Sequence, residues 1–549
     1  MWGTTAYLVA YQQDPDAVGG SLGLSALVSA LPLAVVLVLL GVLRVRAHWA
    51  ALAGLATALV VAVVGFAMPV GMSLLAAAHG ALFGLFPILW IVVNALWVFN
   101  MTVATGHFEV LQRSFGTLSS DIRTQAILVA FCFGGLLEAL AGFGAPVAVT
   151  AVMLMALGFK PIKAAVVALV ANTAPVAFGA MGTPVITLAQ VTNLPLEQVA
   201  SVVGRQTPLL ALFVPLVLVF IVDGTRGLRE AWVPALSCGV VFAIGQFVTS
   251  NYISVPLTDI VASLLGAVVV LSLARIRPNA TWAARQPAVA ATGGPGTAPA
   301  PDSRAQVRLA YAPYVIIVVV FSVVQIPVIK TALDRVKITF PFPGVDILTV
   351  AGKPLTTLNV FTLSALTTAG TLMLVAGLII ATVLRVGLGR MIAIWGRTVN
   401  ELKWAILAVA SVLALAYVMI GSGQTAAIGS FVAGAGAALV FLSPVLGWFG
   451  VAVSGSDTSA NALFGALQVT AAQGAGLPPD LLAAANSSGG VLGKMLSPQN
   501  LAIAAVAVKL EGEEGTLLRK VIGWSLGMLL VLAVLIALQA TPVLGWMLP

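Results

Sequence analysis

The sequence contains unusually few charged side chains. Only 8% of its 549 residues are Asp, Glu, Lys or Arg, whereas 60% are hydrophobic. A soluble domain carries about 25% charged residues. A chain with so little polar surface cannot face water on all sides, which excludes an ordinary soluble protein. We therefore expect an integral membrane protein in contact with the lipid bilayer.

Cysteine and histidine are scarce as well. The two cysteines, Cys132 and Cys238, lie in apolar runs, where burial as small hydrophobic residues is favoured over a disulfide. No Cys/His cluster has metal-ligand spacing, no loop matches GxxxxGK[ST], and no pair of acids accompanies a histidine in a catalytic pattern. The sequence therefore predicts neither an enzyme nor an ATP-driven pump, and it predicts no cofactor and no metal.

Long apolar runs are abundant instead. A membrane-spanning helix needs about 20 mainly apolar residues. Runs of this kind cover residues 22–43, 48–70, 231–249, 257–274, 309–327, 358–384 and 517–540. We expect an all-α polytopic membrane protein with about 12 transmembrane helices plus two re-entrant hairpins.

The positive charges lie in short clusters between these runs. The net charge of +8 thus reflects membrane orientation, because basic loops mark the cytoplasmic side, and we expect no nucleic-acid partner. This rule places both termini outside and makes the Pro-, Ala- and Gly-rich segment 276–308 a flexible cytoplasmic linker. Segment 328–357 is expected to face outside, in mild violation of the rule. It carries four basic residues, Lys330, Arg335, Lys337 and Lys353.

Two segments resemble each other strongly enough to suggest an internal repeat. Residues 171–184 read ANTAPVAFGAMGTP, and residues 485–498 read ANSSGGVLGKMLSP. A Gly-rich block precedes each at a similar interval, and a third pair of matches lies further upstream. Coincidence in a chain rich in Ala, Gly, Val and Leu is the alternative, but three matches in the same order favour a repeat. The charge pattern makes the halves antiparallel, so the repeat is inverted.

This repeat suggests a domain organisation. The first inverted repeat covers 1–222, with a hairpin at about 122–159 and a broken helix over 163–190. Two intervening helices over 223–275 and the linker over 276–308 follow. The second inverted repeat covers 309–549, with a hairpin at about 443–473 and a broken helix over 480–505. Inverted repeats with broken helices and a midplane site recur in secondary transporters. Elevator-type, ion-transporter-like folds are one form of this arrangement.

Two acids within the hairpins are candidates for proton coupling. Glu138 is expected at the turn of the first hairpin, and Asp457 lies in GSDTSAN at the tip of the second. Ionisable residues at membrane depth are expensive and usually face a cavity. The alternatives are a structural ion pair between Glu138 and Lys494, and a hydrogen-bonded turn cap at Asp457.

Hydroxyls, amides and glycines near the hairpin tips and helix breaks predict an anion site. Breaks expected at 172–175 and 486–490 would leave free N–H groups, which attract anions. Lys494 within GGVLGKMLSPQ either pairs with Glu138, Asp457 or the substrate, or extends to the membrane surface. The candidate substrate-binding residues are Gly142, Gly144, Asn172, Thr173, Ser454, Ser456, Thr458, Ser459, Asn486, Ser487, Ser488 and Lys494.

Several long motifs resemble the bacterial L-lactate permease family. They are AFCFGGLLEALAGFGAPVAV, ANTAPVAFGAMGTPV, VGRQTP at 203–208, VSGSDTSANALFGALQ and GGVLGKMLSPQN. The similarity runs nearly end to end. It implies a secondary active transporter that imports L-lactate, D-lactate, glycolate and related 2-hydroxy monocarboxylates with protons across the bacterial inner membrane.

The sequence leaves rival interpretations open. A sodium-coupled or broader-specificity carboxylate or anion carrier would have similar hairpins, and the ion dependence of uptake separates it from a proton-coupled carrier. A passive channel would show no accumulation. The sequence also leaves the oligomeric state open, a homo-oligomer included.

Overall fold

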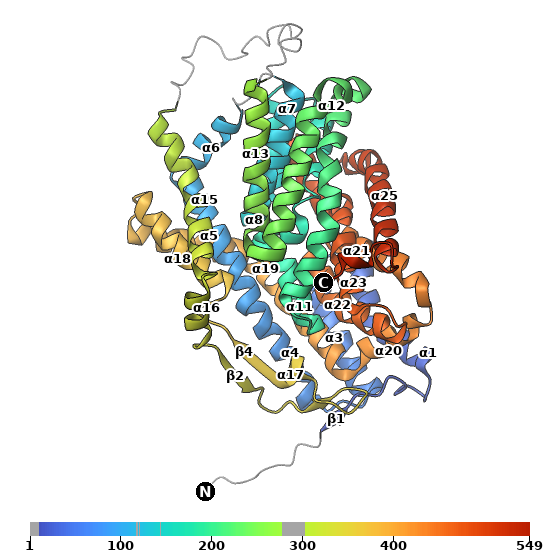
Figure 1. Cartoon of the computed structure of the whole chain (residues 1–549). Coiled ribbons are helices and arrows are strands. Elements are labelled where there is room, and N and C mark those ends of the chain that lie inside the picture. Colours follow the sequence, from blue (N-terminus) through green and yellow to red (C-terminus); the bar gives the residue numbers. More distant parts are fainter. Residues whose placement is uncertain (1–9, 117–118, 120, 143, 277–301) are drawn as a thin grey trace.

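The computed structural model describes residues 10–116, 119, 121–142, 144–276 and 302–549, and its long helices run between two ends of the molecule (Figure 1). Among the described residues, ten helices are long and apolar enough to cross a membrane, or eleven if the bent pair Pro161–Ala171 with Val176–Thr192 counts as one span. The expectation of a polytopic helical membrane protein is therefore confirmed, whereas the finer count and the hairpins stay predictions.

The first part of the chain forms apolar helices joined by short breaks. Its elements are β1 (Tyr11–Gln12), α1 (Leu22–Ser29), α2 (Leu31–Gly41), α3 (Ala47–Val60), η1 (Val61–Gly65), α4 (Val70–Phe83), η2 (Gly84–Leu89), α5 (Trp90–Ala104) and α6 (His107–Gly116). Ser21 caps α1 by accepting a hydrogen bond from the Leu24 amide. Pro87 lies within η2, where it removes one helical hydrogen bond between α4 and α5.

The next segment doubles back within the helical body. Its elements are α7 (Ile122–Ala126), η3 (Ile127–Phe133), α8 (Gly134–Ala141), α9 (Ala145–Ala156), α10 (Pro161–Ala171), η4 (Val176–Phe178) and α11 (Gly179–Thr192). Residues 122–141 are buried almost entirely. The chain turns between α8 and α9 at Gly142 and Gly144, which have φ of +32° and +87°. The helix axis bends by 63° between α10 and α11, at the break that Pro175 predicts.

A helical hairpin follows at the middle of the chain. Its elements are α12 (Leu196–Val248), η5 (Thr249–Ile253), η6 (Val255–Leu257) and α13 (Thr258–Ile276). α12 is interrupted at Asp223 and Gly224, which have non-helical backbone angles. The two arms of α12 contact each other where Gly239 meets the Leu212 carbonyl. α12 therefore consists of two antiparallel arms.

The segment after the linker contains β2, β3 and β4, which follow β1 among the described strands. Its elements are α15 (Arg304–Val324), α16 (Pro327–Asp334), β2 (Ile338–Pro341), β3 (Ile347–Leu348), α17 (Thr356–Asn359), β4 (Val360–Leu363), α18 (Ala369–Val383) and α19 (Leu388–Ser422). β1 pairs in parallel with β3, and β2 pairs antiparallel with β4. These strands lie at one end of the molecule, whereas the ends of α13 and α15 next to the linker lie at the other (Figure 1).

Three expectations for this region need correction. The fold is not purely α-helical, because Ile338–Pro341 and Val360–Leu363 form a short antiparallel sheet rich in β-branched and aromatic residues. The apolar run 358–384 is not one helix either, because it starts at the end of α17, continues as β4 and forms a long helix only from Ala369. Of the expected linker 276–308, residues 277–301 lie outside the described residues, and Arg304 already begins α15, which Ser303 caps.

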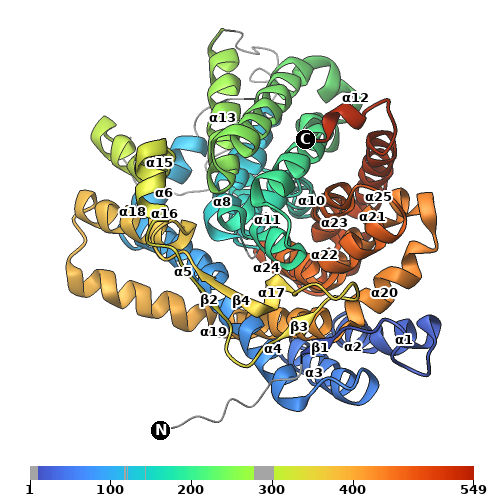
Figure 2. The same cartoon turned by 60° about the horizontal axis from the view of Figure 1, so that its bottom comes forward.

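The last part of the chain builds the centre of the molecule. Its elements are α20 (Gln424–Ala433), η7 (Gly436–Ala438), α21 (Leu439–Ser454), α22 (Asp457–Gly474), α23 (Pro479–Gly493), η8 (Lys494–Leu496), α24 (Pro498–Ala507), α25 (Glu514–Gln539) and η9 (Gly545–Met547). α21 turns into α22 at Gly455, which has a φ of +74°. α11 contacts α22, and α22 contacts α23. These three helices lie near the middle of the view in Figure 2.

The second helix break is not where the sequence predicts it. Residues 486–490 lie inside the continuous helix α23, and the helix breaks only at η8 and Ser497. Gly489 instead allows α23 to pack closely against α21, because it lies against the Pro444 carbonyl. Gly493 lies against the Trp448 carbonyl in the same way. Glycine at a helix contact lets two backbones approach without interrupting either helix.

Candidate functional site

Buried charges meet at the end of α8. Glu138 is 2% exposed and lies in the last turn of that helix. Its Oε1 accepts a hydrogen bond from Lys494 Nζ at 2.5 Å, and its Oε2 accepts one from Asn172 Nδ2 at 3.0 Å. Three residues from three distant segments thus form one group, which we call the Glu138–Lys494 cluster (Glu138, Asn172 and Lys494).

Glycines allow the backbone to approach this cluster. Glu138 lies one helical turn before Gly142, so it is not at the turn itself, as the sequence predicts. Gly142 and Gly144 adopt positive φ, which favours glycine. On the facing helix α11, a Cβ at Gly179 would lie 2.8 Å from Glu138 Oε1. Any side chain at that position would therefore displace the carboxylate.

The position of Lys494 decides between the two interpretations of this residue. Its side chain is buried, with 6% of the residue exposed, and its ammonium bonds to Glu138. Extension to the membrane surface is therefore wrong. The actual helix break lies at Lys494 itself, because α23 ends at Gly493 and Lys494 begins η8.

A second group forms around Asp457, at the first position of α22. Its Oδ2 accepts hydrogen bonds from Ser487 Oγ at 2.7 Å and from Asn461 Nδ2 at 3.4 Å. The residue is 3% exposed. Gly490 of α23, one helical turn before Lys494, faces Asp457 Oδ1, so the two groups meet along the same helix. We call Asp457, Asn461 and Ser487 the Asp457 group.

A line of amides extends the Asp457 group through the helix bundle. Asn486 Nδ2 donates to Asn461 Oδ1 at 2.9 Å, and Gln468 Nε2 donates to Asn486 Oδ1 at 3.3 Å. Ser443 Oγ then donates to Gln468 Oε1 at 2.9 Å. These contacts join α21, α22 and α23, which explains why Asn486 is buried inside a helix rather than at a break.

The hydroxyls at the second hairpin tip mainly stabilise the tip. Ser456 is the N-cap of α22 and accepts from the Ser459 amide at 3.2 Å. Ser454 Oγ donates to the Ser456 carbonyl at 3.2 Å. The residue that caps this turn is therefore Ser456 and not Asp457, whose carboxylate bonds to Ser487 of α23. Ser454, Ser456 and Ser459 are partly exposed. Thr458, also partly exposed, follows Asp457 in the same first turn.

Two further predicted residues lie at the helix contacts. Thr173 Oγ1 donates to the Val170 carbonyl at 2.7 Å, so its hydroxyl is used within the break. Ser488 is fully buried in α23. Neither belongs to the Glu138–Lys494 cluster or to the Asp457 group by a hydrogen bond among the described residues.

The turns at the two predicted hairpin tips lie beside the beginning of α24. A Cβ at Gly144 would lie 3.2 Å from Asn500 Oδ1, and a Cβ at Gly455 would lie 2.9 Å from Gln499 Oε1. Asn500 Nδ2 in turn donates to the Lys494 carbonyl at 3.0 Å. The structure thus brings both predicted tips beside the segment that carries Lys494.

Sequence reasoning missed Asp259, an acid near the Glu138–Lys494 cluster. Asp259 lies in the first turn of α13, is fully buried, and accepts from Gln246 Nε2 at 3.1 Å. Gln246 also donates to the Ala174 carbonyl, at 3.2 Å, in the break between α10 and α11. Glu138 and Lys494 act electrostatically on Asp259. An acid inside the apolar run 257–274 is the signal that identifies it.

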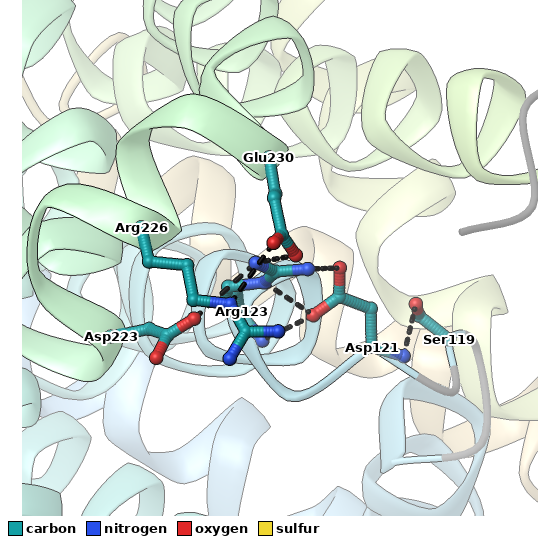
Figure 3. Close-up of polar contacts among 6 residues, drawn as sticks. All are labelled: Ser119, Asp121, Arg123, Asp223, Arg226 and Glu230. Atoms are coloured by element: carbon teal, nitrogen blue, oxygen red, sulfur yellow. Dashed lines mark hydrogen bonds and ion pairs between the residues drawn. The ribbon is translucent and has the colours of Figure 1, made fainter. Parts of the chain in front are cut away.

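A separate charged group lies beside the bend of α12. Arg123 is fully buried and bonds to Asp121 Oδ1 at 3.0 Å and to Glu230 Oε2 at 2.8 Å, with Asp223 Oδ2 at 3.3 Å (Figure 3). Arg226 also pairs with Glu230 at 3.0 Å. Because this group ties the beginning of α7 to the turn between the arms of α12, we interpret it as structural.

The described residues offer no obvious metal site. No group of three or more His, Cys, Asp or Glu side chains within them is placed to hold an ion. Together the two buried groups combine one cation, two acids and several neutral donors within a bundle of apolar helices.

Comparison with known proteins identifies the family. The model of the L-lactate permease family matches residues 25–543. The L-lactate permease of Bacillus subtilis (strain 168) is 40% identical over 557 aligned positions, covering 97% of this chain and 98% of that protein. The glycolate permease GlcA of Escherichia coli (strain K12) is 39% identical over 542 positions, covering 95% and 96%.

Solved structures are more distant. The crystal structure of the Alcanivorax borkumensis YdaH transporter is 14% identical, with a TM-score of 0.47, over 86% of this chain and 89% of that one. The resemblance read from the motifs is confirmed by the family match and by relatives that align nearly end to end. The chain therefore belongs to the L-lactate permease family, whose members are multi-pass membrane transporters and not enzymes.

Proposed function

We propose that this chain imports L-lactate and related 2-hydroxy monocarboxylates, such as glycolate and D-lactate, with protons across the bacterial inner membrane. The names of its relatives support lactate and glycolate as substrates. The observation that carries the proposal is the buried Glu138–Lys494 pair at the end of α23, the helix that also contacts Asp457. A positive charge for the anion and acids for the proton are the minimum that such a carrier needs.

Unpaired polar atoms suggest where the substrate binds. Among the described residues, Asn172 Oδ1, Ser488 Oγ and Asp457 Oδ1 are buried without a hydrogen-bond partner. Buried polar atoms without partners are costly, and a ligand can satisfy them. A 2-hydroxy acid has suitable groups, because its hydroxyl donates to an amide oxygen and its carboxylate accepts from a serine. We place the substrate near Asn172, Thr173, Ser456, Ser487 and Ser488, with Lys494 as the balancing cation.

Proton coupling is assigned to Asp457 first and to Glu138 second. Among the described residues, Asp457 accepts hydrogen bonds only from neutral donors. Because no cation is bonded to it directly, its ionised form repels the carboxylate of an approaching substrate. Protonation removes that repulsion and the cost of burying two anions together. Glu138 already pairs with Lys494. This pairing favours a structural role for Glu138, or a role in which the substrate carboxylate replaces it as the partner of Lys494.

The transport architecture is part of the proposal. The turns at Gly142–Gly144 and at Gly455 are the tips of two re-entrant hairpins, and counting the two arms of α12 separately brings the spans close to the predicted number of about 12. Both tips approach α24, which supports a single core that carries the site. An elevator-type movement of this core between inverted repeats is the corresponding mechanism.

Counterflow of labelled lactate in proteoliposomes tests this function. We expect exchange without a gradient and accumulation when the outside is acidic, with no requirement for sodium. Accumulation that follows a sodium gradient instead would favour a sodium-coupled carrier. Lactate flux that never exceeds equilibrium under any ion gradient would indicate a channel, and no lactate or glycolate flux would refute the substrate assignment.

A further inference from the structure

A large cavity lies at the strand end of the molecule. Its volume is about 850 Å³, and it lies among α4, η2, α11, the beginning of α12, η5, η6 and the segment from α16 to β4. Figure 1 shows β2, β4 and α16 at the end opposite to the termini of α13 and α15 that flank the linker. The orientation predicted from the sequence places this end outside.

Two lysines give the cavity a net positive charge. Its fully charged lining side chains are Lys330, Lys337 and Glu197. Both lysines are exposed to solvent, and neither forms an ion pair with a described residue. Lys330 belongs to α16, and Lys337 follows that helix just before β2. The lysines thus belong to the basic segment that violates the positive-inside rule.

The inner wall of the cavity adjoins the Glu138–Lys494 cluster. Val255 lines the cavity, and a Cβ at Gly182 would lie 2.8 Å from Val255 Cγ1. On the same short segment of α11, Gly179 meets the Glu138 carboxylate. The segment 179–182 therefore links Val255 of the cavity lining to the carboxylate of the buried ion pair.

This separating segment has an unusual backbone. Ala180, Met181 and Gly182 have φ of +43°, +60° and +77°. Consecutive residues in the left-handed region cost free energy for the two that carry a Cβ, and such strain concentrates at moving or functional sites. A strained segment that lies between the lining of a water-accessible cavity and a buried charge cluster is suited to move.

We propose that this cavity is an outer antechamber that collects the monocarboxylate anion before it reaches the buried site. Lys330 and Lys337 hold positive potential at its mouth, and Glu197 weakens that potential. This inference rests on the proposed function, since it takes the substrate to be a small carboxylate. It also accounts for basic residues in a segment that the charge rule would otherwise place inside.

The physical consequence is a salt-dependent apparent affinity. Attraction by exposed charges raises the local concentration of the anion, and salt screens it with a Debye length of about 10 Å at 0.1 M. A single charge acting across about 10 Å of water changes that concentration about twofold. The maximal rate should not change, because neither lysine contacts the buried groups.

The test compares lysine variants in intact cells or right-side-out vesicles. We expect Lys330→Gln/Lys337→Gln to raise the KM for labelled lactate about fourfold at low ionic strength, with an unchanged maximal rate, and we expect the difference to vanish at high salt. Glu197→Gln should lower the KM. Lys353→Gln is the matched control, because Lys353 lies in the same basic segment but does not line the cavity.

The possible outcomes separate the two proposals. A double variant with the wild-type KM at low salt overturns the antechamber, and so does a Lys353→Gln effect of the same size. Wild-type vesicles that take up neither lactate nor glycolate overturn the proposed function instead. Surface abundance is measured for each variant, and the opposite shift expected of Glu197→Gln keeps the test decisive if the double variant is poorly inserted.

Discussion

Lys494 shows how far single residues could be read from the sequence. A lysine inside an apolar run requires an explanation, so the sequence marks it together with Glu138, Asp457 and Asn172. The pairing itself could not be read, because Lys494 and Glu138 are 356 positions apart and no local pattern connects them. Asp259 carries the same signal, because an acid in an apolar run has the same physical meaning anywhere in the chain, but no glycine-rich motif accompanies it.

Proton coupling is testable at two of these residues. We expect Asp457→Asn to lose pH-driven accumulation of lactate while it retains equilibrium exchange, since the neutral amide resembles the protonated acid. Glu138→Gln should impair coupling less. Both activities are measured in the same proteoliposomes.

Two results would contradict this assignment. If both variants accumulate lactate as the wild type does, neither acid carries the proton. If Asp457→Asn also loses equilibrium exchange of lactate, Asp457 contacts the substrate or supports the fold, and the assignment of proton coupling to it is contradicted.

The ion pair predicts a non-additive effect on stability. Lys494→Met should destabilise the protein by about 3 kcal/mol, because it leaves the Glu138 carboxylate buried without its cation. The double variant Glu138→Gln/Lys494→Met should recover at least half of that loss, since no buried charge then remains in the pair. Thermal unfolding of the purified protein in detergent measures both, and strictly additive losses would show that the two side chains are not coupled.

At the scale of helices, proline and glycine differ in what they predict. Pro175 predicts a break correctly, because proline lacks an amide hydrogen and cannot continue the helix undisturbed. Gly489 and Gly490 predict one wrongly. A glycine in an apolar helix either loosens the helix or admits a neighbouring backbone, and only the position of α21 decides between these uses.

The contact between α21 and α23 predicts a strong effect of a small substitution. Gly447→Ala should destabilise the protein by about 1–3 kcal/mol, because a methyl group there would overlap the Asn486 backbone. Gly527→Ala is the matched control, since a Cβ at Gly527 in α25 meets nothing within 4 Å. The control should be neutral or slightly stabilising. Equal melting temperatures for the two variants would refute the close contact.

The arrangement of the whole molecule predicts which ends face the same side. The chain begins its described part at the strand end, and Arg205 Nη1 in the first arm of α12 donates to the Met547 carbonyl near the C-terminus at 2.7 Å. Both ends of the described chain therefore lie opposite to the linker, as the charge rule requires if the linker is cytoplasmic.

Cysteine labelling tests this orientation. A membrane-impermeant maleimide should label Ala351→Cys from outside in intact cells, and it should label Ala290→Cys only after the membrane is opened. The native thiols give little background, because Cys132 and Cys238 are buried. Labelling of Ala290→Cys from outside alone would overturn the orientation and, with it, the inverted repeat.

The glycine contact between α21 and α23 also has a mechanical meaning. Where Gly447, Gly489 and Gly493 bring the two backbones together, no side chain can change its rotamer to let one helix slide or tilt against the other. This contact is therefore rigid, and α21 and α23 move together as one rigid body. The backbone motion that transport requires must then lie at the ends of this helix pair, at Gly455 and at the short turn that holds Lys494, so this turn is where Lys494 changes its position relative to α23.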